Sequence, residues 1–157
     1  MKISIFCGGR GSSEIIKGLT KINDIELTLL INGYDDGKST GRVRDFVPGI
    51  LGPSDFRKNL SVLLSLGTKS DIFLSKILEY RIQKLEDVAH IFEENNQTWI
   101  TSGKSNNELI EFFKVLPLNK FFKIKEYFDI FIDYSKKQSK LFNYADCAIG
   151  NILLAGA

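Results

Sequence analysis

Two adjacent aspartates, Asp35 and Asp36, begin the segment of this chain whose side chains are best suited to chemistry. The ten residues 35–44 also contain small hydroxyl side chains, two glycines and two arginines, and they follow a strongly apolar run, 27–31. Carboxylates can bind a divalent cation or a sugar hydroxyl, whereas arginines and backbone amides can bind phosphate. A solvated loop is the alternative interpretation, because polar loops are common at protein surfaces.

A glycine-rich turn forms a second candidate site. It follows an apolar strand, 2–7, and it precedes a predicted helix that Ser12 or Ser13 can cap. The order of strand, turn and helix places backbone amides and a helix N-terminus against an anion. The residues expected there are Gly8, Gly9, Arg10, Gly11 and Ser12. A tight turn without a ligand is the alternative.

Two familiar phosphate sites do not fit these loops. A dinucleotide fingerprint requires glycine where this chain has Glu14, and the acid expected after the second strand is replaced by Asn32. The run 33–39 resembles a P-loop, but its glycines are one residue too close. Its two carboxylates would repel phosphate, and the later glycines and prolines indicate that no helix follows directly. We therefore reject both interpretations.

The elements that position these loops predict an α/β fold. Strands at 2–7 and 25–31 with a helix between them imply a parallel sheet with a right-handed crossover. Both polar loops then emerge at the carboxyl edge of the sheet, where such folds bind ligands. After a segment expected to be an irregular loop, 32–54, Asp55 is expected to cap an amphipathic helix that buries Phe56, Leu60, Leu63 and Leu64. Asp55, Arg57 and Asn59 would lie close to the same edge.

The second half of the chain is predicted to be almost entirely helical. Helices are expected at about 71–80, 85–95, 106–116, 121–134 and 148–157, with a brief strand or turn at Trp99–Thr101. The phenylalanine pairs at 112/113 and 121/122 are expected to pack helix against helix. We interpret 1–157 as one domain in which 71–144 is a helical insertion or cap. Two strands are too few for a stable sheet, so we expect an N-terminal portion of a larger fold with an incomplete sheet.

Composition limits the classes of partner. The chain has 157 residues, of which 43% are hydrophobic and 25% are charged, as in ordinary globular proteins. A net charge of +2 argues against nucleic acid as a partner, and no apolar stretch is long enough to cross a membrane. Two distant cysteines, Cys7 and Cys147, without a secretory signal predict buried free thiols and a cytoplasmic location. A homo-oligomer or a second chain that completes the sheet remains open.

Four blocks of sequence resemble the 2-phospho-L-lactate transferase (CofD-like) superfamily, and they occur in the family's order. The second block is similar to the gluconeogenesis-factor (YvcK-like) branch more than to the transferase branch. The blocks are Gly8-Gly9-Arg10-Gly11 before a helix that ends in Lys17-Gly18-Leu19; Asp35-Asp36-Gly37-x-Ser39-x-Gly41-Arg42-x-Arg44; Pro53-x-Asp55-x-Arg57-x-x-Leu60; and Gly150-Asn151-x-Leu153-Leu154.

The resemblance implies a Rossmann-like parallel sheet with helices on both faces and a nucleotide-diphosphate ligand. In the gluconeogenesis-factor branch the ligand is a uridine-diphosphate sugar and the role is regulatory. In the transferase branch a magnesium-dependent reaction transfers a phosphoacid group from a guanosine-diphosphate-activated donor. By this analogy Asp35 or Asp36 binds the metal or the acceptor. The nucleotide side is expected to include Gly8, Gly9, Arg10, Gly11, Ser12, Ser39, Arg42, Asp55, Arg57, Gly150 and Asn151.

Overall fold

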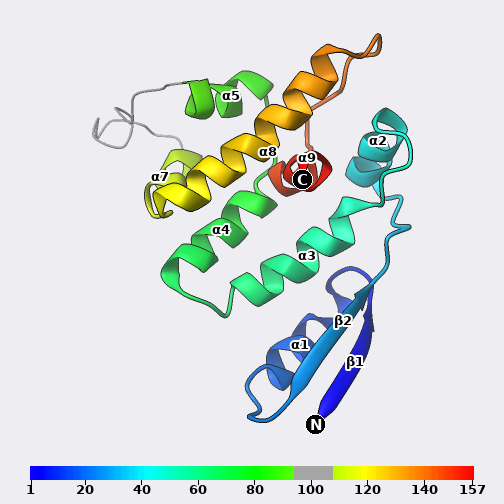
Figure 1. Ribbon diagram of the computed structural model, residues 1–157, viewed down its shortest axis with the longest axis vertical. Helices are drawn as coiled ribbons and strands as arrows, with labels where there is room; N and C mark the ends of the chain where they lie inside the picture. The colour runs from blue at the N-terminus through cyan, green and yellow to red at the C-terminus, as the bar shows by residue number, and fades with distance from the viewer. Residues whose placement is uncertain (94–107) are drawn as a thin grey trace.

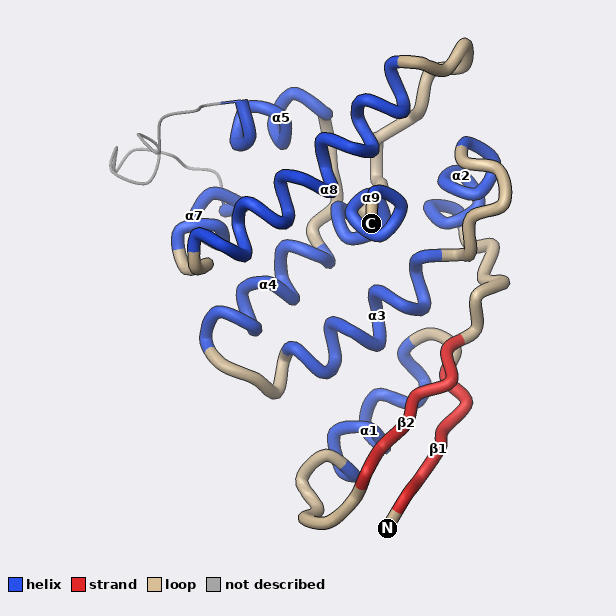
Figure 2. Tube along the Cα trace, viewed as in Figure 1, coloured by secondary structure: helices blue, strands red, loops and turns tan. Residues whose placement is uncertain are grey.

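The two predicted strands pair in parallel. In the computed structural model, which describes residues 1–93 and 108–157, β1 (Lys2–Cys7) lies beside β2 (Glu26–Ile31) in register from Lys2 opposite Glu26 to Cys7 opposite Ile31. A 3-10 turn, η1 (Arg10–Ser12), and α1 (Ser13–Leu19) connect them. Figure 2 shows that the strands lie together near the N-terminus and that helices form most of the remaining structure. The predicted α/β class with a partial parallel sheet is confirmed.

The two faces of this strand pair differ in exposure. Ile3, Ile5 and their partners Leu27 and Leu29 are half-buried, and Figure 1 shows α1 running beside the pair. The opposite face alternates with them and is open, with Phe6 86% exposed. The described part of the chain therefore leaves one sheet face accessible.

The segment 32–54 is not the irregular loop that we expected. Its middle forms α2 (Lys38–Phe46), which buries Thr40, Val43 and Phe46 at helical spacing. Only two of its four buried residues are apolar, and glycine and charged residues surround them, so the pattern is too weak to recognise in the sequence. One argument against a P-loop, the absence of a helix after the aspartates, is therefore wrong, whereas the short glycine spacing and the two carboxylates still exclude it.

The next helix, α3 (Pro53–Leu64), differs from its prediction at both its start and its buried face. Proline occupies the first turn, where its missing amide hydrogen costs nothing, so Gly52 is the N-cap and Asp55 does not cap the helix. Phe56 is 53% exposed and Leu63 38% exposed, while Leu60 and Leu64 are only partly buried. The fully buried side is mainly polar: Pro53, Ser54, Asp55, Arg57, Asn59 and Ser61.

The remaining helices agree with the prediction to within a few residues. They are α4 (Lys69–Glu79), α5 (Leu85–Glu93), α7 (Glu108–Lys114), α8 (Leu118–Lys136) and α9 (Ile149–Gly156). Thr68 and Asp71 form a reciprocal capping box at the start of α4. The expected strand or turn at Trp99–Thr101 lies outside the described residues. None of the described helices is both long and apolar enough to span a membrane.

Helix α9 lies among the other helices and packs against α8, α3, α4 and α2 (Figure 1). The main hydrophobic core therefore includes residues from the range 71–144 that was interpreted as an insertion or cap. Phe112 and Phe113 are buried, and Phe121 packs against Phe113 at a ring distance of 5.8 Å. Phe122 is 55% exposed, so only one residue of the second phenylalanine pair joins this packing.

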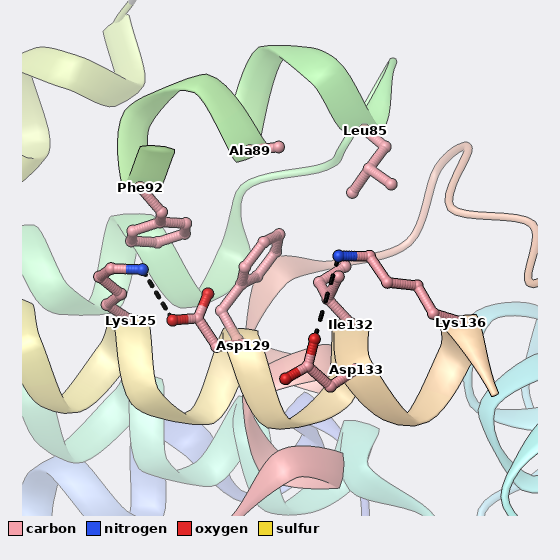
Figure 3. Close-up of a pocket in the computed structure, with 9 residues that line it drawn as sticks. Leu85, Ala89, Phe92, Lys125, Asp129, Ile132, Asp133 and Lys136 are labelled. Carbon is pink, nitrogen blue, oxygen red and sulfur yellow. Dashed lines mark hydrogen bonds and ion pairs between the residues drawn. The ribbon is translucent and has the colours of Figure 1, made fainter. Parts of the chain in front are cut away.

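A cavity of about 370 Å³ lies between α5 and α8, away from both polar loops (Figure 3). Its inner wall includes Phe92, while two ion pairs lie along α8, Lys125–Asp129 at 2.7 Å and Lys136–Asp133 at 3.9 Å. None of the residues predicted to bind a nucleotide or metal lines this cavity. The candidate site therefore lies outside this cavity.

Candidate functional site

The start of α9 brings a buried amide into a cluster of hydroxyl groups. Asn151 has no exposed surface, and its Nδ2 donates to Ser39 Oγ at 2.9 Å and to Ser54 Oγ at 3.0 Å. Its Oδ1 accepts a 2.9 Å hydrogen bond from Arg57 Nε. Because amide donors and acceptor are all used, the side chain is held in one orientation. Asn151 thereby joins α9 to α2 and α3.

A buried guanidinium lies on one side of this amide. Arg57 is 1% exposed, and its NH1 lies 2.5 Å from Glu79 Oε2 at the end of α4. The same carboxylate oxygen accepts a 2.6 Å bond from Arg10, whose side chain is 68% exposed in the glycine turn. Burial lowers the pKa of Arg57, against the opposing influence of Glu79. Burial acts to raise the pKa of Glu79, but its arginine partners outweigh this and lower it.

Hydroxyl groups continue the network on the other side of Asn151. Ser54 hydrogen-bonds to Thr40, and Thr40 Oγ1 donates to Asp35 Oδ2 at 2.8 Å. Ser54 Oγ accepts a hydrogen bond from Asn151, so its own hydroxyl proton can be donated to Thr40. The hydroxyl proton of Thr40 is then donated to Asp35. An unbroken path of contacts thus runs from Arg10 in the glycine turn to Asp35 in the aspartate loop.

Asp55 belongs to a second polar cluster, which includes Lys58 and Asn59 and lies next to the glycine turn. It is 5% exposed, and its Oδ1 pairs with Lys58 Nζ at 3.0 Å. Asn59 Nδ2 donates to the backbone oxygens of Gly8 and Asp55, both at 2.8 Å. A Cβ at Gly9 would lie 3.6 Å from Asp55 Oδ1, so α3 approaches the turn closely. The expected proximity of α3 to the glycine turn is therefore present.

The two adjacent aspartates have different surroundings. Asp35 is half-buried and bonds to Thr40, whereas Asp36 is exposed and lies 3.4 Å from Arg44 NH1. Arg44 NH1 also lies 3.4 Å from the backbone oxygen of Asp35. Within residues 1–93 and 108–157, no three histidine, cysteine or acidic side chains gather in a group that could hold a metal ion.

Arg42 binds backbone carbonyl groups. Its NH1 donates to the oxygens of Ala145 at 2.6 Å and Asn143 at 3.3 Å, which lie in the segment that leads into α9. Ser39, one turn earlier in α2, is 7% exposed and donates to Cys147 Sγ at 3.4 Å. Burial raises the pKa of the Cys147 thiol, which keeps it protonated. Arg42 and Ser39 therefore connect α2 to the segment that precedes α9.

Gly150 at the start of α9 and Gly11 in the glycine turn differ in the space around them. A Cβ at Gly150 would lie 2.7 Å from Arg57 Cδ and 2.8 Å from the backbone oxygen of Leu78, so only glycine fits. At Gly11 a Cβ would meet no atom within 4 Å. Beside Gly11, the buried Ser12 hydroxyl has no hydrogen-bond partner among the described residues. Gly150 permits close packing, whereas Gly11 leaves open space at the turn.

Sequence reasoning missed three members of the network: Thr40, Ser54 and Glu79. Thr40 and Ser54 lie inside the recognised motif blocks, and this position was a signal that their hydroxyl groups could be buried in the site. Glu79 lies at the end of an ordinary amphipathic helix, and nothing in its local sequence indicates that it neutralises a buried arginine. Only the packing of α4 against α3 reveals this role.

The fold and the site define an α/β domain of Rossmann-like type, with polar loops at the carboxyl edge of a parallel strand pair. The family model described as 2-phospho-L-lactate transferase CofD matches residues 3–156. The chain therefore belongs to the CofD family. No solved structure matches it significantly.

Curated relatives carry the name gluconeogenesis factor. A putative gluconeogenesis factor of Streptococcus pneumoniae is 31% identical over 121 residues, which cover 77% of this chain and 35% of that protein. The Thermotoga maritima protein of the same name is 32% identical over 84 residues, 54% of this chain and 25% of the relative. The gluconeogenesis factor of Bacillus subtilis is 34% identical over 89 residues, 55% of this chain and 26% of the relative. The matched regions thus span about a quarter to a third of these relatives.

Proposed function

We propose that this chain supplies the nucleotide-binding part of a gluconeogenesis-factor-type regulatory protein, and that its ligand is a uridine-diphosphate sugar. The observation that carries the proposal is the path of contacts from Arg10 to Asp35. It makes the glycine turn, the aspartate loop and the start of α9 one unit. Family membership and the names of the relatives support the same function.

The glycine turn is the proposed binding site for the diphosphate. Its residues are exposed or half-buried, and the turn leads through η1 into α1, whose N-terminal amides favour an anion. Arg10 is positioned at this turn and exposed, so it can exchange its pairing with Glu79 for a phosphate oxygen. Gly150, Asn151, Ser39, Arg42, Asp55 and Arg57 support this site through the buried contacts described above.

The proposed location is the cytoplasm, where Cys7 and Cys147 stay reduced. Both thiols are buried and free in the structure. The open sheet face around Phe6 is where a second copy or another chain would complete the sheet. Nucleic acid is not among the proposed partners, because the net charge is only +2.

A thermal-shift screen tests the proposal. Uridine and guanosine diphosphates and their sugar conjugates are added to the chain, and the unfolding midpoint is followed. A ligand at 100 times its Kd stabilises the folded state by about 2.7 kcal/mol, so the preferred conjugate should raise the midpoint by several degrees. Arg10→Ala should reduce this shift. Lys2→Ala removes another exposed cation, at the far end of β1, and should preserve the shift. No shift with any nucleotide diphosphate would refute the proposal.

A magnesium-dependent transferase is the second candidate, favoured by the description of the matching family. Its donor would be a guanosine-diphosphate-activated phospholactate-type compound. Mg²⁺ is commonly held by one or two carboxylates together with phosphates and water, and Asp35 and Asp36 are the residues that would hold it here. When bound, the ion would neutralise charge on the phosphates. Turnover that disappears in Asp36→Asn while donor binding persists would establish this candidate over the regulatory one.

A further inference from the structure

A polar pocket of about 430 Å³ lies beside the aspartate loop. It is lined by residues from the loop after β2, from α2 and from the connection between α2 and α3, among them Tyr34, Asp36, Arg44, Asp45 and Leu51. Its volume lies within the range of small-molecule pockets. Asp35, which belongs to the network, is not among its lining residues, so the aspartate pair divides between two environments.

Close backbone packing shapes the wall of this pocket. Gly52 N donates to Gly33 O at 2.7 Å, which ties the α2–α3 connection to the end of β2. A Cβ at Gly33 would lie 3.3 Å from Leu51 Cδ2, so glycine lets Leu51 approach. Gly49 has φ +83°, a left-handed conformation that other residues rarely adopt, and it turns the chain back toward the pocket. The hollow is therefore built by the loops themselves.

The charges of this pocket disfavour phosphate. Two carboxylates, Asp36 and Asp45, and one guanidinium, that of Arg44, are among the groups that line it. The Asp36 side chain is 74% exposed and Arg44 is 32% exposed, so both can reach a ligand. A second phosphate site would need excess positive charge, whereas carboxylates accept hydrogen bonds from hydroxyl groups. The pocket suits a neutral ligand rich in hydroxyls.

An exposed ring adds an apolar surface to these polar groups. Tyr34 is 78% exposed and Leu51 is 64% exposed, although both are large side chains that would gain from being covered. The C–H face of a sugar ring matches such a surface, and its hydroxyl edge matches the carboxylates. Neither a bare phosphate nor a planar apolar ligand would use both kinds of group.

We propose that this pocket binds the sugar of the nucleotide sugar, while the diphosphate binds at the glycine turn. The assignment rests on the proposed function, and it gives Asp36 a hydroxyl-binding role. The two loops then have different roles. The glycine turn supplies positive charge and amides for the phosphates, and the aspartate loop supplies carboxylates and an aromatic ring for the sugar.

Titration calorimetry with UDP and with UDP-glucose tests this assignment. We expect the unaltered chain to bind UDP-glucose about tenfold more tightly than UDP, which corresponds to about 1.4 kcal/mol. Tyr34→Ala and Asp45→Asn should bring this ratio close to one and leave UDP affinity unchanged. Tyr34→Phe keeps the ring and should keep the ratio. Asp133→Asn, an exposed aspartate of α8, is the matched control for Asp45.

The outcomes distinguish this assignment from the proposed function. An unaltered chain that binds neither ligand overturns the proposed function, and the sugar assignment with it. Binding of both ligands with equal affinity overturns only the sugar assignment. The assignment is also overturned if the Tyr34 and Asp45 variants weaken UDP and UDP-glucose by the same factor, since a merely structural role would do that.

Discussion

Replacing Asn151 with alanine removes the central member of the buried network. Its side chain makes three hydrogen bonds. It donates to Ser39 at 2.9 Å and to Ser54 at 3.0 Å, and it accepts from Arg57 at 2.9 Å. Asn151 has no exposed surface, so water cannot readily take the place of its amide. The substitution would leave two hydroxyls and the Nε of a buried guanidinium without their partner.

The size of the effect follows from these three bonds. A hydrogen bond between neutral groups contributes about 1 kcal/mol, and one to a charged group about 2 kcal/mol. We therefore expect Asn151→Ala to lower the free energy of unfolding by about 4 kcal/mol, a large share of the total for a domain of this size. With a urea m-value of about 2 kcal/mol/M, the midpoint falls by about 2 M.

Urea unfolding followed by circular dichroism measures this change. Asn119→Ala is the matched control, because Asn119 is exposed in the first turn of α8 and the same atoms are removed there. It should change the free energy of unfolding by no more than about 0.5 kcal/mol. If both variants unfold at the same urea concentration, the network does not stabilise the fold and the reasoning is refuted.

Two further predictions concern packing and pH. Gly150→Ala should destabilise the chain by about 1–3 kcal/mol, because its Cβ would overlap Arg57, whereas Gly11→Ala should have little effect on urea unfolding; equal effects would contradict the packing argument. Hydrogen bonds from Lys120 and Thr68 lower the pKa of Asp71 from 3.8 to about 2. Because the folded-state pKa is the lower one, the associated stability is present above pH 3.8 and is lost as the pH falls toward 2. In an acid-unfolding titration, Asp71→Asn should lose less stability than the unaltered chain as the pH falls from 3.8 toward 2. An unchanged acid-unfolding curve would refute the assignment.

Most elements of the fold could be predicted because their patterns are local. The strands at 2–7 and 25–31 are short apolar runs bounded by turn residues, and the structure confirms both to within one residue. The α2 helix was missed because its buried residues are few and its other positions are glycine or charged. The buried side of α3 was misjudged because a polar face normally indicates solvent.

The candidate site was only partly visible in the sequence. Motif blocks identified Arg10, Asp35, Arg57 and Asn151 as a group, and the structure connects these four through hydrogen bonds and ion pairs. Their roles as ligand-binding residues remain predictions. The fully buried state of Arg57 could not be inferred, because an arginine is rarely buried unless a partner compensates its charge.

The sequence by itself therefore determined the strand pair, the two polar loops at its carboxyl edge and the helical second half, because each depends on residues close together in the chain. The tertiary structure alone decided that Glu79 compensates Arg57 and that Asp36 faces a pocket while Asp35 faces the network. Burying a charge is tolerated only where the packed helices bring a counter-charge within contact distance. That juxtaposition arises from the packing of α3 against α4 and α9, which no local pattern specifies.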